Sequence, residues 1–171
     1  MRPLPRNRPD QPRQPERAGL EPPYTIRPAC PADLPYLPAL EQNAAQAFCA
    51  IPGLEWLATG GTLPLVAHQA SLASRTCWVA VDATGRLLGF LSACFYPDAL
   101  HIQEMAVMLA AQGHGLGRRL LGAACAAARA QGVRGVTLTT FLAVPWNAPF
   151  YARAGFCLLP PKALNPPVPY T

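Results

Sequence analysis

The densest group of residues able to do chemistry is the segment 112–119, which reads QGHGLGRR. Its three glycines stand at alternate positions, and such a backbone can curl so that successive N–H groups point the same way. An amphipathic helix is predicted directly after the loop, and its unpaired first-turn amides and positive dipole end would add further donors. The segment therefore predicts a cradle for an anion such as a pyrophosphate, with Arg118 and Arg119 beside it.

The sequence motifs of two other phosphate-binding loops do not match this segment. A P-loop requires G-x-x-x-x-G-K-[ST], whereas the only lysine of the chain is Lys162. A dinucleotide fingerprint requires G-x-G-x-x-G at the start of a βαβ unit, whereas this loop reads G-x-G-x-G and follows several predicted hairpin strands. A glycine-rich turn that only connects two elements is the remaining alternative.

Two titratable residues lie in the strand predicted just before the loop, over 100–108. Glu104 is the only acid in this otherwise apolar strand. Burying an unpaired carboxylate lowers the stability of the fold, so we expect Glu104 to have a specific role. A structural hydrogen-bonding role is the alternative to a catalytic one. Strand alternation predicts that Glu104 shares a face with Ile102 and Ala106, and that His101 and Met105 lie on the opposite face.

The elements that must position these residues follow from periodicity and turn signals. Strands are expected over 24–27, 77–81, 87–95, 100–108 and 136–141, with a hairpin turn at 82–86. Helices are expected from 31 to 48, with Asp33 in the first turn, and over 63–74, 118–130 and 147–154. His68 is expected on a helix surface, and a last strand is expected to start at 156–159. The order of elements indicates an α/β or α+β domain with one mixed sheet.

Composition indicates one globular domain. The chain has 171 residues, of which 51% are hydrophobic and 13% charged, and it is long enough to bury a sizeable core. Seven of the 21 prolines fall in residues 1–23. Because proline prevents both helix and central strand, we predict a disordered tail there and a domain over 24–171 whose last strand is uncertain.

Charge and cysteine usage exclude several classes of protein. The net charge of +5 is modest, and no basic run with interleaved aromatic residues occurs in the middle of the chain, so nucleic acid is not an expected partner. The N-terminus has no apolar stretch of the kind that a signal peptide needs, and no segment has the length of a membrane span. The six cysteines are widely spaced without C-x-x-C, which favours free thiols and no metal site. A soluble cytoplasmic protein without a membrane partner is expected.

The loop also resembles a family motif. Gln112, Gly115 and Gly117 match the acyl-CoA loop Q/R-x-x-G-x-G/A of the Gcn5-related N-acetyltransferase (GNAT) superfamily. The strand before the loop and the helix after it are similar to that family, as is the run 146–156, which ends in Y-x-x-x-G-F. The resemblance covers about residues 24–159. It implies a GNAT fold, that is, one mixed, mostly antiparallel sheet flanked by helices and splayed at the acetyl-CoA site.

The resemblance implies an N-acetyltransferase that moves the acetyl group of acetyl-CoA, a co-substrate, to a primary amine of a small molecule by direct attack in a ternary complex. An alkylamine with a pKa near ~10 is mostly protonated at neutral pH, so a base must remove a proton. Tyr151 resembles the family's general acid. Glu104 is the favoured base, acting through a water, and His101 is the competing base because it matches a catalytic histidine of the arylalkylamine members.

The resemblance also implies which residues contact the cofactor. The spacing from Asn147 to Tyr151 is shorter than in most of the family. Asn147 therefore stands at a different place relative to Tyr151 than the asparagine that contacts the cofactor in those members. The expected cofactor-binding residues are Met105, Ala106, Val107, Gln112, Gly113, His114, Gly115, Leu116, Gly117, Arg118 and Asn147.

The acceptor is not fixed by any motif. It depends on the loops around residues 48–75, and four aromatic residues could line its pocket or be simple core: Phe48, Trp56, Phe141 and Trp146. A protein or peptide N-acetyltransferase and a non-catalytic acyl-CoA-binding sensor are the alternative functions. A homodimer is compatible with the family.

Overall fold

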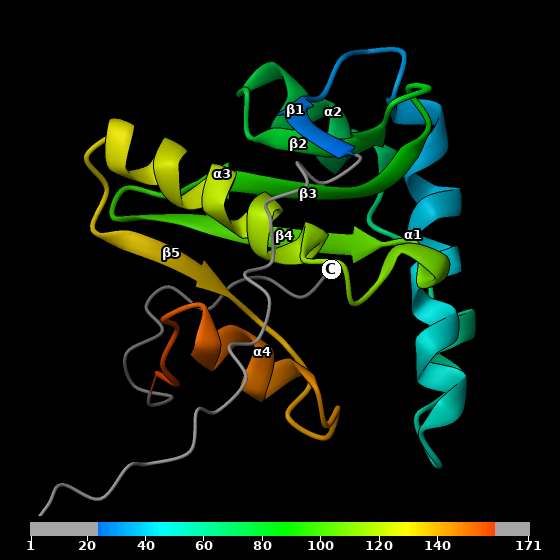
Figure 1. Cartoon of the computed structure of the whole chain (residues 1–171). Helices are drawn as coiled ribbons and strands as arrows, with labels where there is room; N and C mark the ends of the chain where they lie inside the picture. The colour runs from blue at the N-terminus through cyan, green and yellow to red at the C-terminus, as the bar shows by residue number, and fades with distance from the viewer. Residues whose placement is uncertain (1–23, 160–171) are drawn as a thin grey trace, which may run out of the picture.

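A single five-stranded sheet organises the protein. The computed structural model describes residues 24–159, so the tail predicted at 1–23 and the residues after 159 lie outside the described part. The strand order is β1-β2-β3-β4-β5, antiparallel as far as β4, with β4 and β5 parallel (Figure 1). The strands are β1 Tyr24–Pro28, β2 Cys77–Asp82, β3 Leu87–Phe95, β4 Ala99–Val107 and β5 Gly135–Leu138. The predicted mixed, mostly antiparallel sheet is confirmed.

Helices cover both faces of the sheet. The α-helices are α1 Leu37–Ala45, α2 Leu65–Ala73, α3 Leu116–Ala130 and α4 Asn147–Arg153. The short 3-10 helices are η1 Leu34–Tyr36, η2 Gln46–Ala50, η3 Glu55–Thr59 and η4 Leu109–Ala111. Residues 48–57 include most of η2 and of η3.

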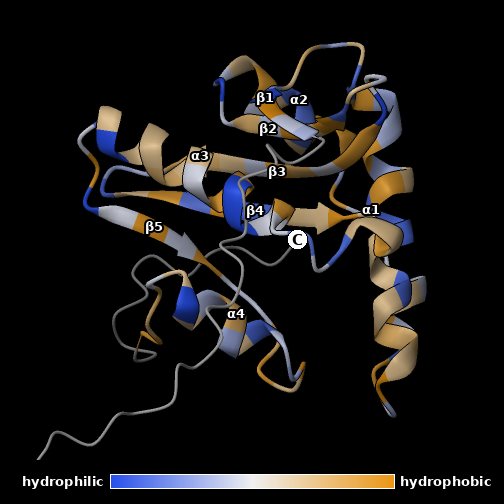
Figure 2. Cartoon of the chain, in the orientation of Figure 1, coloured by the Kyte–Doolittle hydropathy of each residue, from blue (hydrophilic) through white to orange (hydrophobic). Residues whose placement is uncertain are grey.

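Two buried clusters hold the layers together. On one face, Leu120 and Ala124 of α3 pack against Leu91 and Ile102 of the central strands. On the other face, Leu37 and Leu40 of α1 pack with Val79, Phe90 and Ala106. Figure 2 shows hydrophobic colour predominating along β3, as a strand buried between two helical layers requires.

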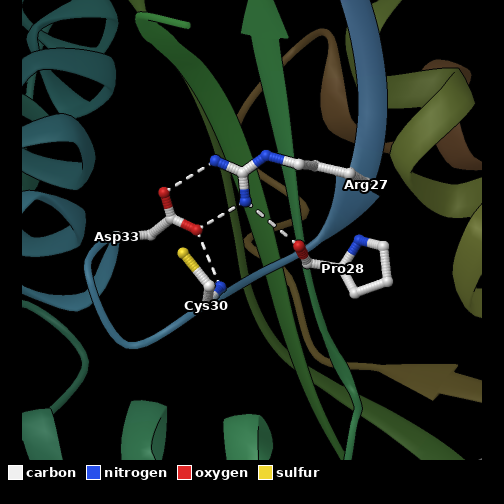
Figure 3. Close-up of polar contacts among 4 residues, drawn as sticks. All are labelled: Arg27, Pro28, Cys30 and Asp33. Atoms are coloured by element: carbon white, nitrogen blue, oxygen red, sulfur yellow. Dashed lines mark hydrogen bonds and ion pairs between the residues drawn. The ribbon is translucent and has the colours of Figure 1, made fainter.

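A partly buried ion pair joins the first strand to the first helical turn (Figure 3). Arg27 donates to both oxygens of Asp33, at 2.7 and 2.9 Å, and the Cys30 N–H donates to Asp33 Oδ2 at 2.8 Å. The bond to Arg27 is the first cause that lowers the pKa of Asp33. Asp33, which the sequence placed in a helix first turn, therefore serves to fix the crossing from β1 to η1.

A β-bulge in β4 changes which residues share a face. Ser92 lies opposite Glu104 and Ala93 lies opposite Ile102, so Gln103 is an extra residue. His101 lies opposite Cys94. Because Ser92 and Cys94 are two residues apart in β3, Glu104 and His101 point to the same face. The prediction that they lie on opposite faces is wrong, because simple alternation does not continue through a bulge.

His68 is buried, so the prediction of a surface position is wrong. Its side chain is 0% exposed, its Nδ1 lies 2.9 Å from Ser92 Oγ, and its ring meets the Phe90 ring edge-on at 5.2 Å. Burial lowers the pKa of His68. The imidazole is therefore a neutral part of the packing between α2 and the sheet.

The last strand predicted to start at 156–159 is also absent from the described residues. Gly155 has φ +91°, and the Phe156 N–H turns back to donate to the Tyr151 carbonyl at 3.0 Å. This closes the C-terminus of α4 in the manner of a glycine cap. The segment after α4 therefore begins by capping the helix.

Two glycines provide a matched test of the packing. A Cβ at Gly89 would lie 2.8 Å from the Ala106 carbonyl oxygen, where β3 and β4 approach closely. We expect Gly89→Ala to lower the free energy of unfolding by about 1–3 kcal/mol, because backbone must move. Gly122, inside α3, has no heavy atom within 4 Å of its added Cβ, so Gly122→Ala should raise stability by about 0.5–1 kcal/mol. Urea denaturation measures both, and equal stability of the two variants would contradict the packing described.

Candidate functional site

The site lies where β4 and β5 part. The two strands pair only over Ala99–Ile102 and Gly135–Leu138. The Met108 N–H donates to the Leu88 carbonyl at 2.8 Å, and bonded and non-bonded pairs alternate along an antiparallel ladder. The N–H of Val107, one residue earlier, therefore points away from β3 and toward the side from which β5 has diverged.

The glycine-rich loop after β4 is held in a defined shape. Gln112 Nε2 donates to the Val107 carbonyl at 3.1 Å, and the Tyr24 hydroxyl donates to the His114 carbonyl at 2.8 Å. Gly113 (φ +79°) and Gly115 (φ +82°) adopt the left-handed conformation that favours glycine. Gly115 is also the N-cap of α3, so the following amides of the first helical turn have no partner within the helix.

Positive charge is unopposed around this loop. All nine acidic residues of the chain lie at or before Glu104, whereas six basic residues follow it. Arg118 is exposed on the first turn of α3, and the Arg119 guanidinium lies over the Tyr24 ring, 5.1 Å from its centroid. Helix dipole, free amides and arginines together fit a polyphosphate.

The titratable side chains of Glu104 and Tyr151 are coupled beside the divergence of β4 and β5. Glu104 Oε1 accepts the Met105 N–H at 3.0 Å, and burial raises the pKa of this carboxyl. Burial, and then the charge of Glu104, raise the pKa of Tyr151 to about 12. The phenol therefore keeps its proton at neutral pH, close enough to Glu104 to respond to its charge.

Glu41 is a third acid group, which the sequence analysis missed. Both of its carboxylate oxygens accept the Leu63 N–H, at 3.1 and 3.0 Å. Burial, and then the charge of Glu104, raise the pKa of Glu41 to about 7, opposed by that hydrogen bond. A sequence signal existed, because Glu41 lies on the same helical stripe as Leu37, Leu40 and Ala44.

Two predicted site residues are engaged elsewhere. His101 is buried, its Nδ1 lies 3.0 Å from Thr137 Oγ1 across the paired part of β4 and β5, and burial lowers its pKa. Asn147 Nδ2 donates to Thr140 Oγ1 at 2.7 Å, which ties the first residue of α4 to the end of β5. His101 thus lies in the closed part of the sheet, and Asn147 fixes the segment that carries Tyr151.

Four aromatic rings connect the two sides of the site. Phe48 stacks near Trp146 with a centroid distance of 6.2 Å, and Trp56 meets Phe141 edge-on at 6.0 Å. We call these four residues the aromatic bridge. It joins η2 and η3 to the segment between β5 and α4.

Residues 24–159 contain no cluster of three or more histidine, cysteine or acidic side chains that could hold a metal ion. Of the helices in this range, none combines the length and the apolar character needed to span a bilayer. All six cysteines are free, as predicted.

The acid pair formed by Glu41 and Glu104 predicts an unusual pH dependence. A carboxyl whose pKa is raised from 4.5 to about 7 stabilises the fold below pH 4.5, and that contribution is lost as the pH rises from 4.5 to 7. Glu41→Gln keeps an acceptor for Leu63 but carries no charge. We expect the variant to be more stable than wild type at pH 8, by on the order of 1 kcal/mol after solvent screening, with no such gain at pH 4.5.

Thermal unfolding at both pH values measures this difference. Glu55→Gln, at an exposed position of η3, is the matched control and should show the same difference from wild type at both. If the stability of Glu41→Gln relative to wild type were the same at pH 4.5 and at pH 8, the surroundings of Glu41 would not raise its pKa.

Solved structures with this fold include several acetyltransferases. One of the GNAT family from Staphylococcus aureus MU50 has a TM-score of 0.69 and 14% identity, over 86% of this chain and 93% of that one. A GNAT family acetyltransferase from Brucella melitensis, solved with acetyl-CoA, has a TM-score of 0.56 and 22% identity, over 79% and 83%. The ribosomal-protein-S18-alanine N-acetyltransferase from Escherichia coli has a TM-score of 0.61 and 21% identity, over 77% and 76%.

These identities are low, so the three likenesses establish the fold alone. The sequence itself matches the family model described as "Acetyltransferase (GNAT) family" over residues 39–156, more than half of the chain. The matched range contains the parted strands, the glycine-rich loop, α3 and Tyr151. The chain therefore belongs to the GNAT family of acetyltransferases.

Proposed function

We propose that the protein transfers the acetyl group of acetyl-CoA to a primary amine of a small molecule, by direct attack within a ternary complex. The observation that carries this proposal is the parting of β4 and β5 beside Glu104 and Tyr151, with the basic glycine loop at its end. Bound acetyl-CoA would supply an activated thioester. Side chains and backbone amides of this chain would supply the cofactor contacts, the general base and the proton donor.

The loop and the edge of β4 are the proposed cofactor-binding elements. Residues 113–118 would hold the pyrophosphate through the amides of the loop and of the first turn of α3, helped by Arg118. Gln112 serves by bonding the Val107 carbonyl, which fixes the loop on the strand. Residues 105–107 offer backbone groups to the pantetheine arm, and the outward Val107 N–H suits a carbonyl oxygen that gains negative charge.

Glu104 is the proposed general base. A carboxyl with a raised pKa holds a proton more firmly than an ordinary one, which suits removal of a proton from an ammonium group, directly or through a water. His101 is the weaker candidate because its Nδ1 is engaged by Thr137 where the strands are still paired. The charge of Glu104 also raises the pKa of nearby Glu41, so the two carboxyls together favour holding a proton.

Tyr151 is the proposed proton donor to the leaving sulfur. Its pKa of about 12 keeps the hydroxyl protonated throughout the working pH range. A protonated phenol can donate a hydrogen bond to a thiolate, which needs a donor as the bond to carbon breaks. Asn147 supports this role by fixing the start of the helix that carries Tyr151.

Tyr151→Phe tests the assignment most directly. Loss of the hydroxyl should lower kcat about 10²–10⁴-fold, the usual contribution of a positioned acid or base, while the affinity for acetyl-CoA changes little. Steady-state release of CoA thiol with a panel of primary amines measures kcat, and calorimetry measures acetyl-CoA binding.

Tyr24→Phe is the matched control because it removes the same atom from a different place. Its hydroxyl holds the loop through the His114 carbonyl, so its loss should raise the KM for acetyl-CoA about fivefold, the value of one hydrogen bond, and leave kcat near that of wild type. Unchanged turnover in Tyr151→Phe would overturn the assignment. Thiol release with peptides alone, or binding of acetyl-CoA without release for any amine, would overturn the proposed function.

A further inference from the structure

We propose that the acceptor is a compact primary amine carried on an aromatic group, which the aromatic bridge binds while Glu41 and Glu104 receive the ammonium. This inference rests on the proposed function and names the acceptor class of the same site. It depends on three features, namely exposure of the bridge, its link to the helices that carry Glu41 and Tyr151, and the charge of Glu41 and Glu104.

The bridge is an exposed cluster and no part of the core. Trp56, Phe141 and Trp146 are 58%, 48% and 42% exposed, and none of the four rings belongs to the buried clusters of residues 24–159. Large apolar side chains that gather at one exposed place usually mark a ligand or partner site. The alternative that these residues are simple core is therefore wrong.

The bridge joins the segments that adjoin the two helices carrying Glu41 and Tyr151. Phe48 follows Glu41 by seven residues, along α1 and into η2, and Gln46 Nε2 donates to the Ala58 carbonyl, which holds η2 against η3. On the other side, Trp146 is the N-cap of α4, which carries Tyr151. A ligand held by the rings would thus have the segment that continues from the helix of Glu41 on one side and the start of the helix of Tyr151 on the other.

Charge complements the rings. Burial, and then the charge of Glu104, make Glu41 costly to ionise, burial does the same for Glu104, and no cationic side chain in the described residues bonds to either. An ammonium group would relieve their repulsion. The faces of tryptophan and phenylalanine rings attract cations, and their apolar area favours a flat hydrophobic group.

The geometry favours a compact ligand with one charge. A polyamine would need a carboxylate for its far end, and Glu55, next to Trp56, is the candidate among the described residues. An extended peptide would need room past the two ring contacts that join η2 and η3 to the β5–α4 segment. Both classes are outcomes that the experiment separates from the proposed one.

Intrinsic fluorescence can test recognition without catalysis. Two of the three tryptophans of the chain lie in the bridge, and the third, Trp78, is buried. Titration of the full chain, saturated with CoA so that no transfer occurs, should give a saturable change with 2-phenylethylamine. Burial of one ring predicts binding at least about tenfold tighter than that of n-propylamine.

Phe141→Ala keeps both tryptophan reporters and removes one wall of the bridge. It should weaken 2-phenylethylamine about tenfold and leave n-propylamine nearly unchanged, and kcat/KM with acetyl-CoA should show the same loss of preference. Phe141→Tyr should restore most of the preference. Leu142→Ala, the neighbouring residue at 64% exposure and outside the ring contacts, is the control and should alter neither amine.

The outcomes separate this inference from the proposed function. A preference for spermidine that Glu55→Gln abolishes, a preference for peptides, or an unchanged preference in Phe141→Ala would overturn the inference even if amines are acetylated. Binding of 2-phenylethylamine with no acetylation would overturn the proposed function and leave the recognition in place. Failure of both binding and turnover would overturn both.

Discussion

The extra residue Gln103 in β4 is the constraint on which the site depends. By shifting the register against β3, it turns Glu104 onto the face covered by α1, together with His101 and Ala106. Without the bulge, alternation from Ile102 would place Glu104 among the leucines beneath α3, where an unpaired charge would cost several kcal/mol. The bulge therefore moves one carboxylate from a place where it would weaken the fold to one where it faces another acid.

The order of charges along the chain explains how one site can take two ligands of opposite charge. Acidic residues end at Glu104, and the loop and α3 that follow contain only basic ones. The sheet brings the acidic and the basic part of the chain together where β4 and β5 part. The glycine loop and the N-terminus of α3 lie after the end of β4, and Glu104 lies within β4, directly after the bulge. The anionic cofactor and the cationic acceptor that we propose would thus be drawn to neighbouring places without competing.

Sequence reasoning succeeded where the signal is local. The glycine spacing of the loop, the hairpin at 82–86 and the apolar stripe of α3 depend on neighbours in sequence, and the structure confirms each of these elements. Failures occurred where a distant partner decides. The bulge depends on pairing with β3, the buried position of His68 depends on its contacts with Ser92 and Phe90, and the raised pKa of Glu41 depends on burial and then on the charge of Glu104. Glu41 alone could have been found, because an acid on a buried helical stripe is unusual.

Three acids removed from solvent, Asp33, Glu41 and Glu104, differ in whether a cation pairs with them. Asp33 is paired with Arg27, and its pKa is lowered by that bond (Figure 3). Glu41 and Glu104 have no such cation among the described side chains, and each gains instead in affinity for protons. Leaving two carboxyls without a counter-charge costs stability, which a fold tolerates where function gains. In the proposed reaction, a protonated amine would supply the missing charge and, by giving up its proton to these carboxyls, would become the neutral nucleophile. The unfavourable ionisation of these two carboxyls lowers the stability of the protein without acceptor. In the proposed reaction, the same cost would favour both binding of the ammonium and transfer of its proton.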